Sequence, residues 1–588
     1  MTISGVLRSR YFIAICLFVA AGVLALMWAM QLMDSIYAYR SPLRSQPPTI
    51  QVPLGPAISQ RLIIVLVDGL REDTSHDADL MPYLQTLRGK GAWAVMHSRP
   101  LSYSQPGYST LLVGAWPDIN DGPAVNLDHD KIPALTQDNL FAAVHRLGGR
   151  TAVAGHDTLG KLIARPDVNE SFYTPEANAA GDALIFDKTL QWLDAGGQTL
   201  MLVHLSQVDD AGDYLGGPKS EAWAEAATRV DGMIQMIGAK LDLTKDTLMI
   251  VSDHGQIDAG GHGGPEAVNL VEPLIAAGAG INPGYFGNVQ MVDVAPTAAA
   301  LLGAAIPATS QGRVIRAMLV LDPTVASGLN AAEEAQQKQL YEYYARAIGT
   351  SATLQETTDA VAKYQAGIER ARENRMSGEV MGRVFLILIP LAAAIFFTWK
   401  FSSRALLERV LLFLPYGLVF TAVYMLIFRQ TFSLSRVQTE TGMILGIVVS
   451  SAAGLLAAWL AAVYLRRIFS EGWETVASGT LALTGVFMVL LALPVAAHFV
   501  LNGTLARWTL PEMNTAFFGL LSMIQILSLA VLGLLLAGIA ALVKRSLDRR
   551  TAKEEGRMDF VPASIAADMD RRPAQAKKRT GRRSARRK

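Results

Sequence analysis

Long uncharged apolar runs occupy the two ends of the chain and leave a mixed middle region between them. Residues 11–33 carry no charge, and a helix of this length can cross a hydrocarbon core of about 30 Å. Five comparable runs follow later, at residues 384–399, 410–428, 442–465, 476–501 and 515–543. The pattern predicts an N-terminal transmembrane anchor in residues 1–33 and a five-helix transmembrane bundle in residues 381–545.

A cleaved signal peptide is the other interpretation of the first run. That run is longer than the apolar core of most signal peptides, and no small-x-small cleavage site follows it. Both features favour an uncleaved anchor.

Lysine and arginine collect on the cytoplasmic side of membranes, so their placement predicts the orientation. The residues that mark this side are Arg8, Arg10, Lys400, Arg404, Arg409, Arg466, Arg467, Lys544 and Arg545. Arg429 and Arg436 are the exceptions. We expect an integral membrane protein with six transmembrane helices and both termini in the cytoplasm. Residues 34–380 would then lie outside the cytoplasm, in the periplasm, the lumen or the extracellular space.

The composition agrees with a membrane protein, since 51% of residues are hydrophobic and the mean hydropathy is +0.27. The net charge of +1 indicates no partner, because a strongly basic tail is averaged with a balanced middle region. This cytoplasmic tail, residues 546–588, either fixes the topology alone or also binds anionic lipid headgroups or RNA. Membrane lipids are predicted as partners, and no specific nucleic-acid partner is predicted.

Cys16 is the only cysteine in the sequence, which excludes intramolecular disulfides and multi-thiolate metal sites. Any metal ion must therefore be held mainly by histidine and carboxylate side chains.

The middle region alternates short β-rich apolar runs with helical stretches, as in a mostly parallel sheet flanked by helices. Clear strand runs lie at residues 61–67, 199–205 and 247–252. We expect an α/β catalytic domain in residues 60–320. Residues 34–59 form the expected linker before it, and residues 321–380 the expected helical stalk after it.

Acidic residues follow these three strands. Asp68 closes the first, Asp209 follows the second after a short turn, and Asp253 with His254 closes the third. A single aspartate in such a place is usually a turn or cap residue. Because the carboxyl ends of parallel strands meet at one sheet edge, three together predict a metal site there.

Five segments resemble the alkaline-phosphatase superfamily, type I phosphodiesterase/nucleotide pyrophosphatase branch, in that family's order. They are residues 67–71 (VDGLR), 102–117 (SYSQPGYST, then GAWP), 209–216 (DDAGDYLG), 252–264 (SDHG, then GHGG) and 292–303 (VDVAPT, then LG). Each segment alone is a weak signal, but the ordered set over residues 60–318 is strong. The resemblance implies an alkaline-phosphatase-like fold with two divalent metal ions, zinc or manganese.

The resemblance also implies roles for single residues. One metal ion would be held by Asp68, Ser104, Asp253 and His254, and the other by Asp209, Asp213 and His262. Ser104 would be the catalytic nucleophile that forms a phosphoryl-serine intermediate, with Ser102 as the alternative. Asn126 would contact a phosphoryl oxygen, although a turn-capping role fits it equally. A serine hydroxyl needs activation, and metal coordination provides it where no base is adjacent.

Asp213 departs from the family, which usually has histidine at this place. An oxygen-rich ligand set favours harder ions, so we expect weaker zinc selectivity and use of manganese. The alternative is a degenerate site that binds a single metal ion.

Three functions fit the sequence. The first is a phosphodiesterase or phosphotransferase that acts on a nucleotide or a lipid headgroup outside the cytoplasm. The second is a phosphoethanolamine-type transferase from phospholipid to a glycan, because the layout is similar to membrane ethanolamine-phosphate transferases. The third is a non-catalytic membrane scaffold. A helix bundle favours a lipid substrate, since an anchor needs only one helix.

Overall fold

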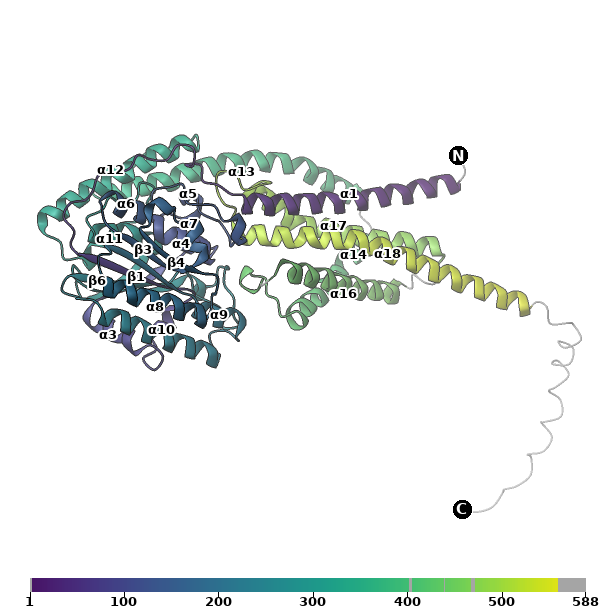
Figure 1. Cartoon of the computed structure of the whole chain (residues 1–588). Helices are drawn as coiled ribbons and strands as arrows, with labels where there is room; N and C mark the ends of the chain where they lie inside the picture. Colours follow the sequence, from purple (N-terminus) through teal and green to yellow (C-terminus); the bar gives the residue numbers. More distant parts are fainter. Residues whose placement is uncertain (1–2, 401–403, 438, 467–470, 559–588) are drawn as a thin grey trace, which may run out of the picture.

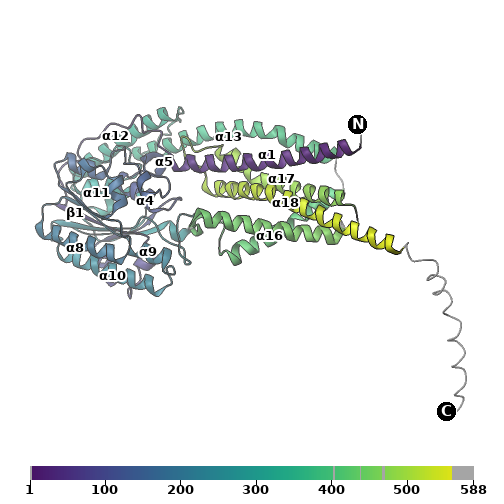
Figure 2. The ribbon, with the colours of Figure 1, turned by 45° about the vertical axis from the view of Figure 1, so that its right-hand side comes forward.

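A computed structural model describes residues 3–400, 404–437, 439–466 and 471–558. Figure 1 shows an α/β domain, residues 38–347 for the most part, at one end of a set of long helices. The N-terminal end of α1 (Ile3–Tyr37) and the C-terminal end of α18 (Met513–Met558) point away from this domain in both Figure 1 and Figure 2. Residues 546–558 of the predicted tail continue the last helix, and residues 559–588 lie outside the described residues.

One eight-stranded sheet forms the centre of the α/β domain, in the order β4-β3-β5-β1-β6-β7-β2-β8. Strand β7 runs antiparallel to both of its neighbours, and the other pairs are parallel. The strands are β1 (Arg61–Val67), β2 (Ala92–His97), β3 (Thr151–His156), β4 (Glu170–Thr174), β5 (Leu200–Leu205), β6 (Asp246–Val251), β7 (Val271–Gly278) and β8 (Gly284–Gln290). The predicted mostly parallel sheet is confirmed.

Helices cover both faces of this sheet. They are α2 (Glu72–Ser75), α3 (Pro82–Lys90), α4 (Ser104–Val113), α5 (Pro117–Asn120), α6 (Leu140–Arg146), α7 (Asp157–Leu162), α8 (Ala179–Ala195), α9 (Gln207–Tyr214), α10 (Glu221–Ala239), α11 (Val294–Leu301) and α12 (Pro323–Ala347). The uninterrupted apolar run of β1 fits its place in the middle of the sheet, since both of its faces are covered.

Alternate side chains of β1 point into two separate cores. Leu62, Ile64 and Leu66 pack against α4, α6, α11 and α12, whereas Ile63 and Val65 pack against α3, α8 and α10. This sandwich fixes the strand ends from which the acidic residues project.

Helix α12 belongs to the covering layer of the α/β domain, although the sequence suggests a stalk here. Leu340 and Tyr344 are buried in the core beneath it. Gln336 and Gln337 donate hydrogen bonds of 2.8 and 2.9 Å to the carbonyl oxygen of Ser310.

Five stretches of helix are long and apolar enough to cross a membrane, one N-terminal and four C-terminal, among the residues that the structure describes. They are Tyr11–Tyr37, Arg404–Ile427, Glu440–Leu465, Trp473–Asn502 and Met513–Lys553. They belong to α1 (Ile3–Tyr37), α14 (Arg404–Leu411) with α15 (Phe413–Ala422) and a π-helical turn (Val423–Ile427), α16 (Glu440–Arg466), α17 (Trp473–Asn502) and α18 (Met513–Met558). Large apolar side chains such as Phe12 and Leu426 are exposed on them, as expected for a lipid-facing surface.

The predicted span at residues 384–399 does not form a separate apolar helix. It is the end of α13 (Ala360–Lys400), which starts on the α/β domain and continues without a break. Within the described part of the chain, four C-terminal helices are long and apolar enough to cross a membrane where the sequence suggested five, and six crossings stay a prediction.

Candidate active site

Three neighbouring strands deliver the acidic residues to one sheet edge. Strand β1 lies between β5 and β6, and all three are parallel. Asp68 follows β1 directly, Asp209 lies in the first turn of α9 after β5, and Asp253 with His254 follows β6. The predicted convergence of these residues is what the structure shows.

Two groups of ligating side chains form at this edge, each with its ligand atoms within 4.8 Å of one another. One consists of Asp68, Asp253 and His254, and the other of Asp209, His254 and His262. The resemblance assigned His254 to one metal ion only, whereas here its Nε2 faces both groups. Its ring stacks on that of His262 with a centroid distance of 3.9 Å.

Asp213 lies beside the second group, at the place where the family usually has histidine. Its Oδ2 is 3.5 Å from Nε2 of His262. The structure thus brings together all six side chains that the sequence suggested as protein ligands besides Ser104.

Ser104 is the first residue of α4, and its Oγ lies 3.2 Å from Nε2 of His254. Helix α4 approaches the site closely because residue 107 is glycine: a Cβ atom there would lie 2.7 Å from Cβ of Asp253. Ser102 has a different environment. Its buried hydroxyl donates to the carbonyl oxygen of Gly264 (3.2 Å) and accepts from the amide of Gly263 (3.1 Å).

Asn126 is exposed near the start of α4. Its Oδ1 accepts a hydrogen bond of 3.0 Å from the amide of Gln105, which leaves its NH2 group as the remaining donor.

Tyr108 and His204 hold Asp68 in place, and no spacing in the sequence signals either role. The hydroxyl of Tyr108 donates to Oδ2 of Asp68, and Nε2 of His204 lies 3.0 Å from the same oxygen. Both side chains are buried. Their contacts turn the other oxygen, Oδ1, toward His254 at 3.4 Å.

Backbone carbonyls fix the two candidate histidine ligands. Nδ1 of His254 lies 3.0 Å from the carbonyl oxygen of Gly255, and Nδ1 of His262 lies 3.0 Å from that of Ser102. Each Nδ1 therefore carries the proton, which leaves Nε2 free to bind a metal ion. Gln256, which the sequence analysis did not single out, donates to Oδ1 of Asp209.

The electrostatics of the site favour a bound cation. Burial raises the pKa of Asp209 well above its ordinary value, and the neighbouring carboxylates of Asp213 and Asp68 raise it further. Burial and the Asp68 carboxylate likewise raise the pKa of Asp253. Burial opposes ionisation of Asp68 too, but the neighbouring imidazoles of His204 and His254 outweigh it and keep its pKa well below 3.8.

Two buried carboxylate oxygens, Oδ1 of Asp68 and Oδ2 of Asp253, accept no hydrogen bond within the described part of the chain. Buried carboxylate oxygens are normally paired or coordinate metal ions. Together with imidazole nitrogens they fit divalent ions of the zinc or manganese kind.

The family profile described as "Type I phosphodiesterase / nucleotide pyrophosphatase" matches residues 140–373. The chain carries a type I phosphodiesterase domain of the alkaline-phosphatase superfamily. The matched residues include Asp209, Asp213, Asp253, His254 and His262, whereas Asp68 and Ser104 precede them.

Curated relatives show distant homology to GPI ethanolamine phosphate transferases. The chain is 27% identical over 284 residues to the human "GPI ethanolamine phosphate transferase 2, catalytic subunit", covering 45% of this chain and 28% of the relative. It is 25% identical over 312 residues to "GPI ethanolamine phosphate transferase 2" of Candida glabrata, covering 45% and 37%. The chain thus spans well under half the length of these relatives.

Solved structures with a similar fold include murine ectonucleotide pyrophosphatase/phosphodiesterase 5. Its TM-score is 0.35 at 13% identity, covering 42% of this chain and 95% of that one. The phosphonate monoester hydrolase of Silicibacter pomeroyi has a TM-score of 0.33 at 15% identity, covering 44% and 76%.

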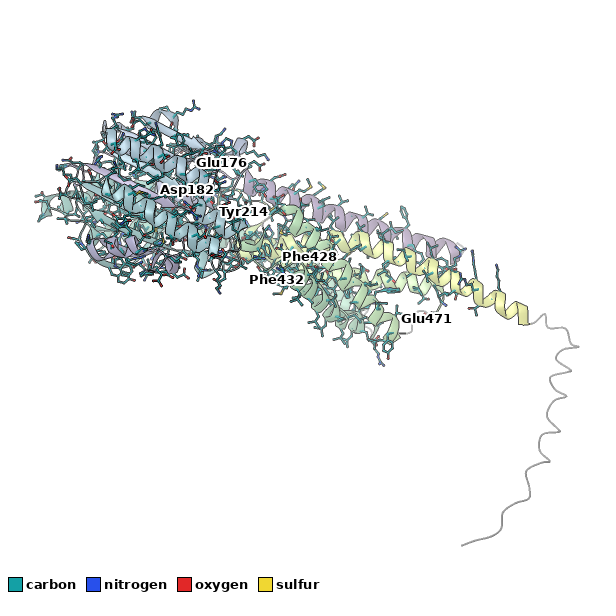
Figure 3. All side chains as sticks on the ribbon, turned by 60° about the horizontal axis from the view of Figure 1, so that its bottom comes forward. Glu176, Asp182, Tyr214, Phe428, Phe432 and Glu471 are labelled. Carbon is teal, nitrogen blue, oxygen red and sulfur yellow. The ribbon has the colours of Figure 1, made fainter. Side chains whose placement is uncertain are left out.

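A cavity of about 330 Å³ lies between the phosphodiesterase domain and the membrane helices. The domain contributes Tyr103, Asn126, Asp213 and His262 to its walls, and Figure 3 shows Tyr214 at the same boundary. The wall on the membrane side is largely apolar and comes from α1, α16 and α18. Its residues include Leu32, Ile36, Met443, Phe517 and Leu520.

A loop between two membrane helices forms hydrogen bonds with the segment of the phosphodiesterase domain that carries His262. The Ser435 hydroxyl donates to Oε2 of Glu266 (2.6 Å) and accepts from the amide of Gly264 (3.0 Å). Nη1 of Arg436 donates to the carbonyl oxygen of Ala259 at 2.7 Å. The candidate metal centre is thus attached directly to the membrane bundle.

Proposed function

We propose that this protein is a membrane-bound, metal-dependent phosphotransferase or phosphodiesterase whose substrate is a lipid phosphodiester. The cavity at the metal centre carries this proposal. One of its walls bears His262 and Asp213, and the opposite wall is formed by apolar side chains of membrane helices. A lipid can place its phosphate on the first wall and its acyl chains against the second. A nucleotide has no acyl chain that would pack against an apolar wall.

Ser104 is the proposed nucleophile, and Asp68, Asp209, Asp213, Asp253, His254 and His262 are the proposed ligands of two metal ions. Such ions supply Lewis-acid stabilisation of the charge on the phosphoryl oxygens. Ser104 Oγ forms a bond to phosphorus while the ester bond to the lipid alcohol breaks. The serine proton passes to the departing alkoxide through water. An acceptor hydroxyl, or water, then takes the phosphoryl group from Ser104 and returns a proton to its oxygen.

The NH2 group of Asn126 is the proposed donor to a phosphoryl oxygen. Asn126 lines the cavity with His262, and its Oδ1 is already fixed by the amide of Gln105. Fixed in this way, the side chain is preorganised to donate.

The cavity also contains groups that suit a cationic headgroup. Glu440 at the start of α16 accepts a hydrogen bond from the hydroxyl of Tyr37, and both side chains line the cavity with Tyr103 and Asp213. Carboxylates and aromatic rings bind ammonium groups. The relatives are named as ethanolamine phosphate transferases, which supports transfer of an amine-bearing headgroup to an acceptor such as a glycan.

For the topology we propose that the phosphodiesterase domain lies outside the cytoplasm and that α13 makes a sixth crossing. The phosphodiesterase domain lies at one end of the helices, and the described ends of α1 and α18 lie at the other (Figure 2). Arg404 and Arg545 also belong to that other end, in agreement with a cytoplasmic location. Reporter fusions to the C-terminus test this orientation.

The decisive experiment compares the full-length wild type with Ser104→Ala and with Ser102→Ala as the matched serine control. The assays use phosphatidylethanolamine labelled in its headgroup, and bis-p-nitrophenyl phosphate as a soluble diester. Ser104→Ala is expected to lose at least 10³-fold in rate on both, roughly the loss of a catalytic nucleophile. Ser102→Ala, if folded, keeps most of its activity.

The alternatives give different results. Equal rates for wild type and Ser104→Ala contradict the nucleophile assignment. Turnover of nucleotides but not of phospholipid contradicts the lipid substrate. Full metal occupancy without turnover of any phosphoester indicates the scaffold.

A further inference from the structure

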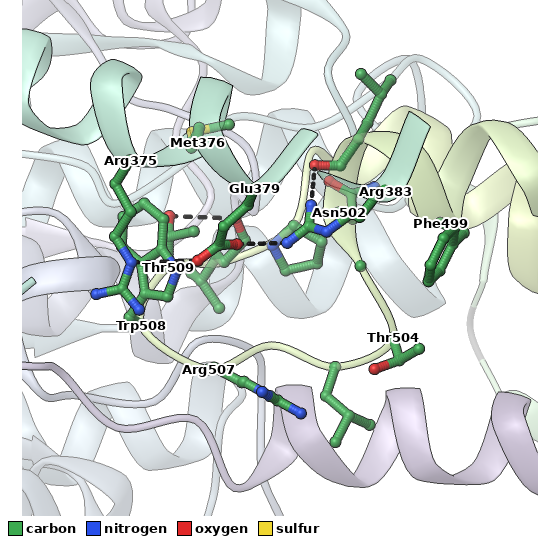
Figure 4. A pocket seen from close by; sticks show the side chains of 15 residues that line it. Arg375, Met376, Glu379, Arg383, Phe499, Asn502, Thr504, Arg507, Trp508 and Thr509 are labelled. Atoms are coloured by element: carbon green, nitrogen blue, oxygen red, sulfur yellow. Dashed lines mark hydrogen bonds and ion pairs between the residues drawn. The ribbon is translucent and has the colours of Figure 1, made fainter. Parts of the chain in front are cut away.

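A second cavity, of about 370 Å³, lies where the membrane helices meet the phosphodiesterase domain. Figure 4 shows its walls, which come from α13, the end of α17 and the loop of residues 503–512 that leads to α18. The residues that line it and those that line the cavity at the metal centre form two separate sets. Its ligand is therefore a question apart from the proposed function.

The walls of this second cavity carry excess positive charge. Arg375, Arg383 and Arg507 line it with a single acidic residue, Glu379. Glu379 pairs with both Arg375 and Arg383, so two guanidinium groups share one carboxylate. Arg507 is exposed and has no ion pair within the part of the chain that the structure describes, and no dashed line reaches it in Figure 4.

The arginines that pair with Glu379 are held in fixed orientations. Arg383 donates a hydrogen bond of 3.0 Å to the carbonyl oxygen of Leu501 at the end of α17. Glycine suits position 503, because its φ of +78° favours glycine and a Cβ atom would lie 3.0 Å from Nη2 of Arg383. The guanidinium of Arg375 stacks on Trp508 at 4.4 Å, and the indole of Trp508 donates to Oε1 of Glu379 at 2.9 Å. Such preorganised planar groups suit phosphate.

The position of the cavity corresponds to the lipid headgroup layer. One candidate span ends at Asn502 and the next begins at Met513, so the loop between them lies at the membrane surface. The indole of Trp28 on α1 donates to the carbonyl oxygen of Thr504, which ties this loop to the N-terminal anchor. Phe499 and Leu505 continue the cavity wall toward the apolar helix surface. Basic groups at this depth attract anionic lipids.

We infer that this cavity is a binding site for an anionic phospholipid, distinct from the substrate site. The headgroup phosphate lies against Arg507, and an acyl chain follows the apolar wall toward Phe499. Free phosphate has the same charged group as the lipid headgroup, but it has no apolar part that would contact the apolar wall. The excess charge favours a lipid with net negative charge over a zwitterionic one.

The test uses full-length protein in neutral detergent, titrated with phosphatidylglycerol or phosphatidylcholine and followed by native mass spectrometry. Arg507→Gln removes the unpaired cation from an exposed position and is expected to fold normally. Arg507→Lys keeps the positive charge but loses the planar guanidinium group, which can donate two parallel hydrogen bonds to a phosphate. Arg370→Gln is the matched control, because Arg370 lies on the same helix α13, pairs only with Gln355 among the described residues, and is not part of the cavity wall.

We expect wild type and Arg370→Gln to retain phosphatidylglycerol in preference to phosphatidylcholine. Arg507→Gln should bind phosphatidylglycerol about tenfold more weakly, on the scale of one charge-assisted hydrogen bond, and Arg507→Lys should fall between. Equal affinity of wild type and Arg507→Gln overturns the inference. So does equal retention of the two lipids by the wild type, or displacement of phosphatidylglycerol by an equal concentration of inorganic phosphate.

Discussion

The hydroxyl of Ser435 donates a 2.6 Å hydrogen bond to the carboxylate of Glu266, and this bond joins a membrane loop to the segment that carries His262. Gly261 and Gly264 of that segment are packed against the same loop. A Cβ atom on Gly261 would lie 2.0 Å from the carbonyl oxygen of Ser435, and one on Gly264 would lie 2.4 Å from its Oγ. The order of the candidate metal centre therefore depends on the membrane bundle.

Ser435→Ala is expected to lower metal affinity about tenfold, because residues behind metal ligands typically contribute 10–100-fold. Isothermal titration calorimetry of the metal-free protein with Mn²⁺ measures the change in metal affinity. Ser478→Ala is the control, since Ser478 lies on α17 and its hydroxyl donates to the carbonyl oxygen of Thr475 on the same helix. An unchanged metal affinity in Ser435→Ala would show that the contact between Ser435 and Glu266 only joins the two parts of the protein and does not support metal binding.

Tyr108→Phe removes the hydroxyl that donates to Asp68 and leaves the buried ring in place. We expect metal affinity to fall by roughly 10–100-fold with little change in melting temperature. Tyr173→Phe is the matched control, because its hydroxyl makes no hydrogen bond among the described residues. A large loss of stability with normal metal affinity would assign Tyr108 to packing instead.

Asp213→His places the family's usual residue beside His262. An added imidazole makes the second ligand group softer, so the ratio of bound zinc to bound manganese should rise. Elemental analysis after equilibration with both ions measures that ratio. A fall in the binding of both ions, with no change in their ratio, would argue against a ligand role for Asp213.

Glu72 predicts a pH dependence of stability away from the metal centre. Burial raises the pKa of Glu72 from 4.5 to about 7, although the nearby Arg88 opposes the shift. The folded protein thus holds this proton more tightly than the unfolded chain. Its contribution to stability is complete below about pH 4.5 and is lost as pH rises to about 7. The melting temperature of wild type should fall over this window more steeply than that of Glu72→Gln. Parallel curves for the two proteins would contradict the assignment.

The strand positions and the acidic edge could be predicted because they depend on local patterns. Residues 61–67 form a continuous apolar run that ends at Asp68, and β1 spans the same residues. The contacts of Asp68 with Tyr108 and His204 could not be predicted, since they join residues 40 and 136 positions apart and leave no spacing signal.

The membrane contribution to the cavity was also hidden from the sequence. Tyr37 and Glu440 are 403 positions apart and follow no motif, and their contact arises only when α1 and α16 pack at the metal centre. The sequence also could not show that His254 belongs to both ligand groups, because this depends on where the folded chain places its imidazole ring. Helix α13 was divided in the prediction because hydropathy changes at residue 384 while the backbone continues as a helix.

That continuous helix has a consequence for how the proposed enzyme would meet its substrate. At 41 residues, α13 is about 60 Å long, and it joins the surface of the phosphodiesterase domain to the bilayer as one rigid strut. In the proposed topology, the candidate metal centre is thereby kept at a constant height above one leaflet. Turnover would then follow the number of substrate molecules per unit area of membrane rather than their concentration in the surrounding solution.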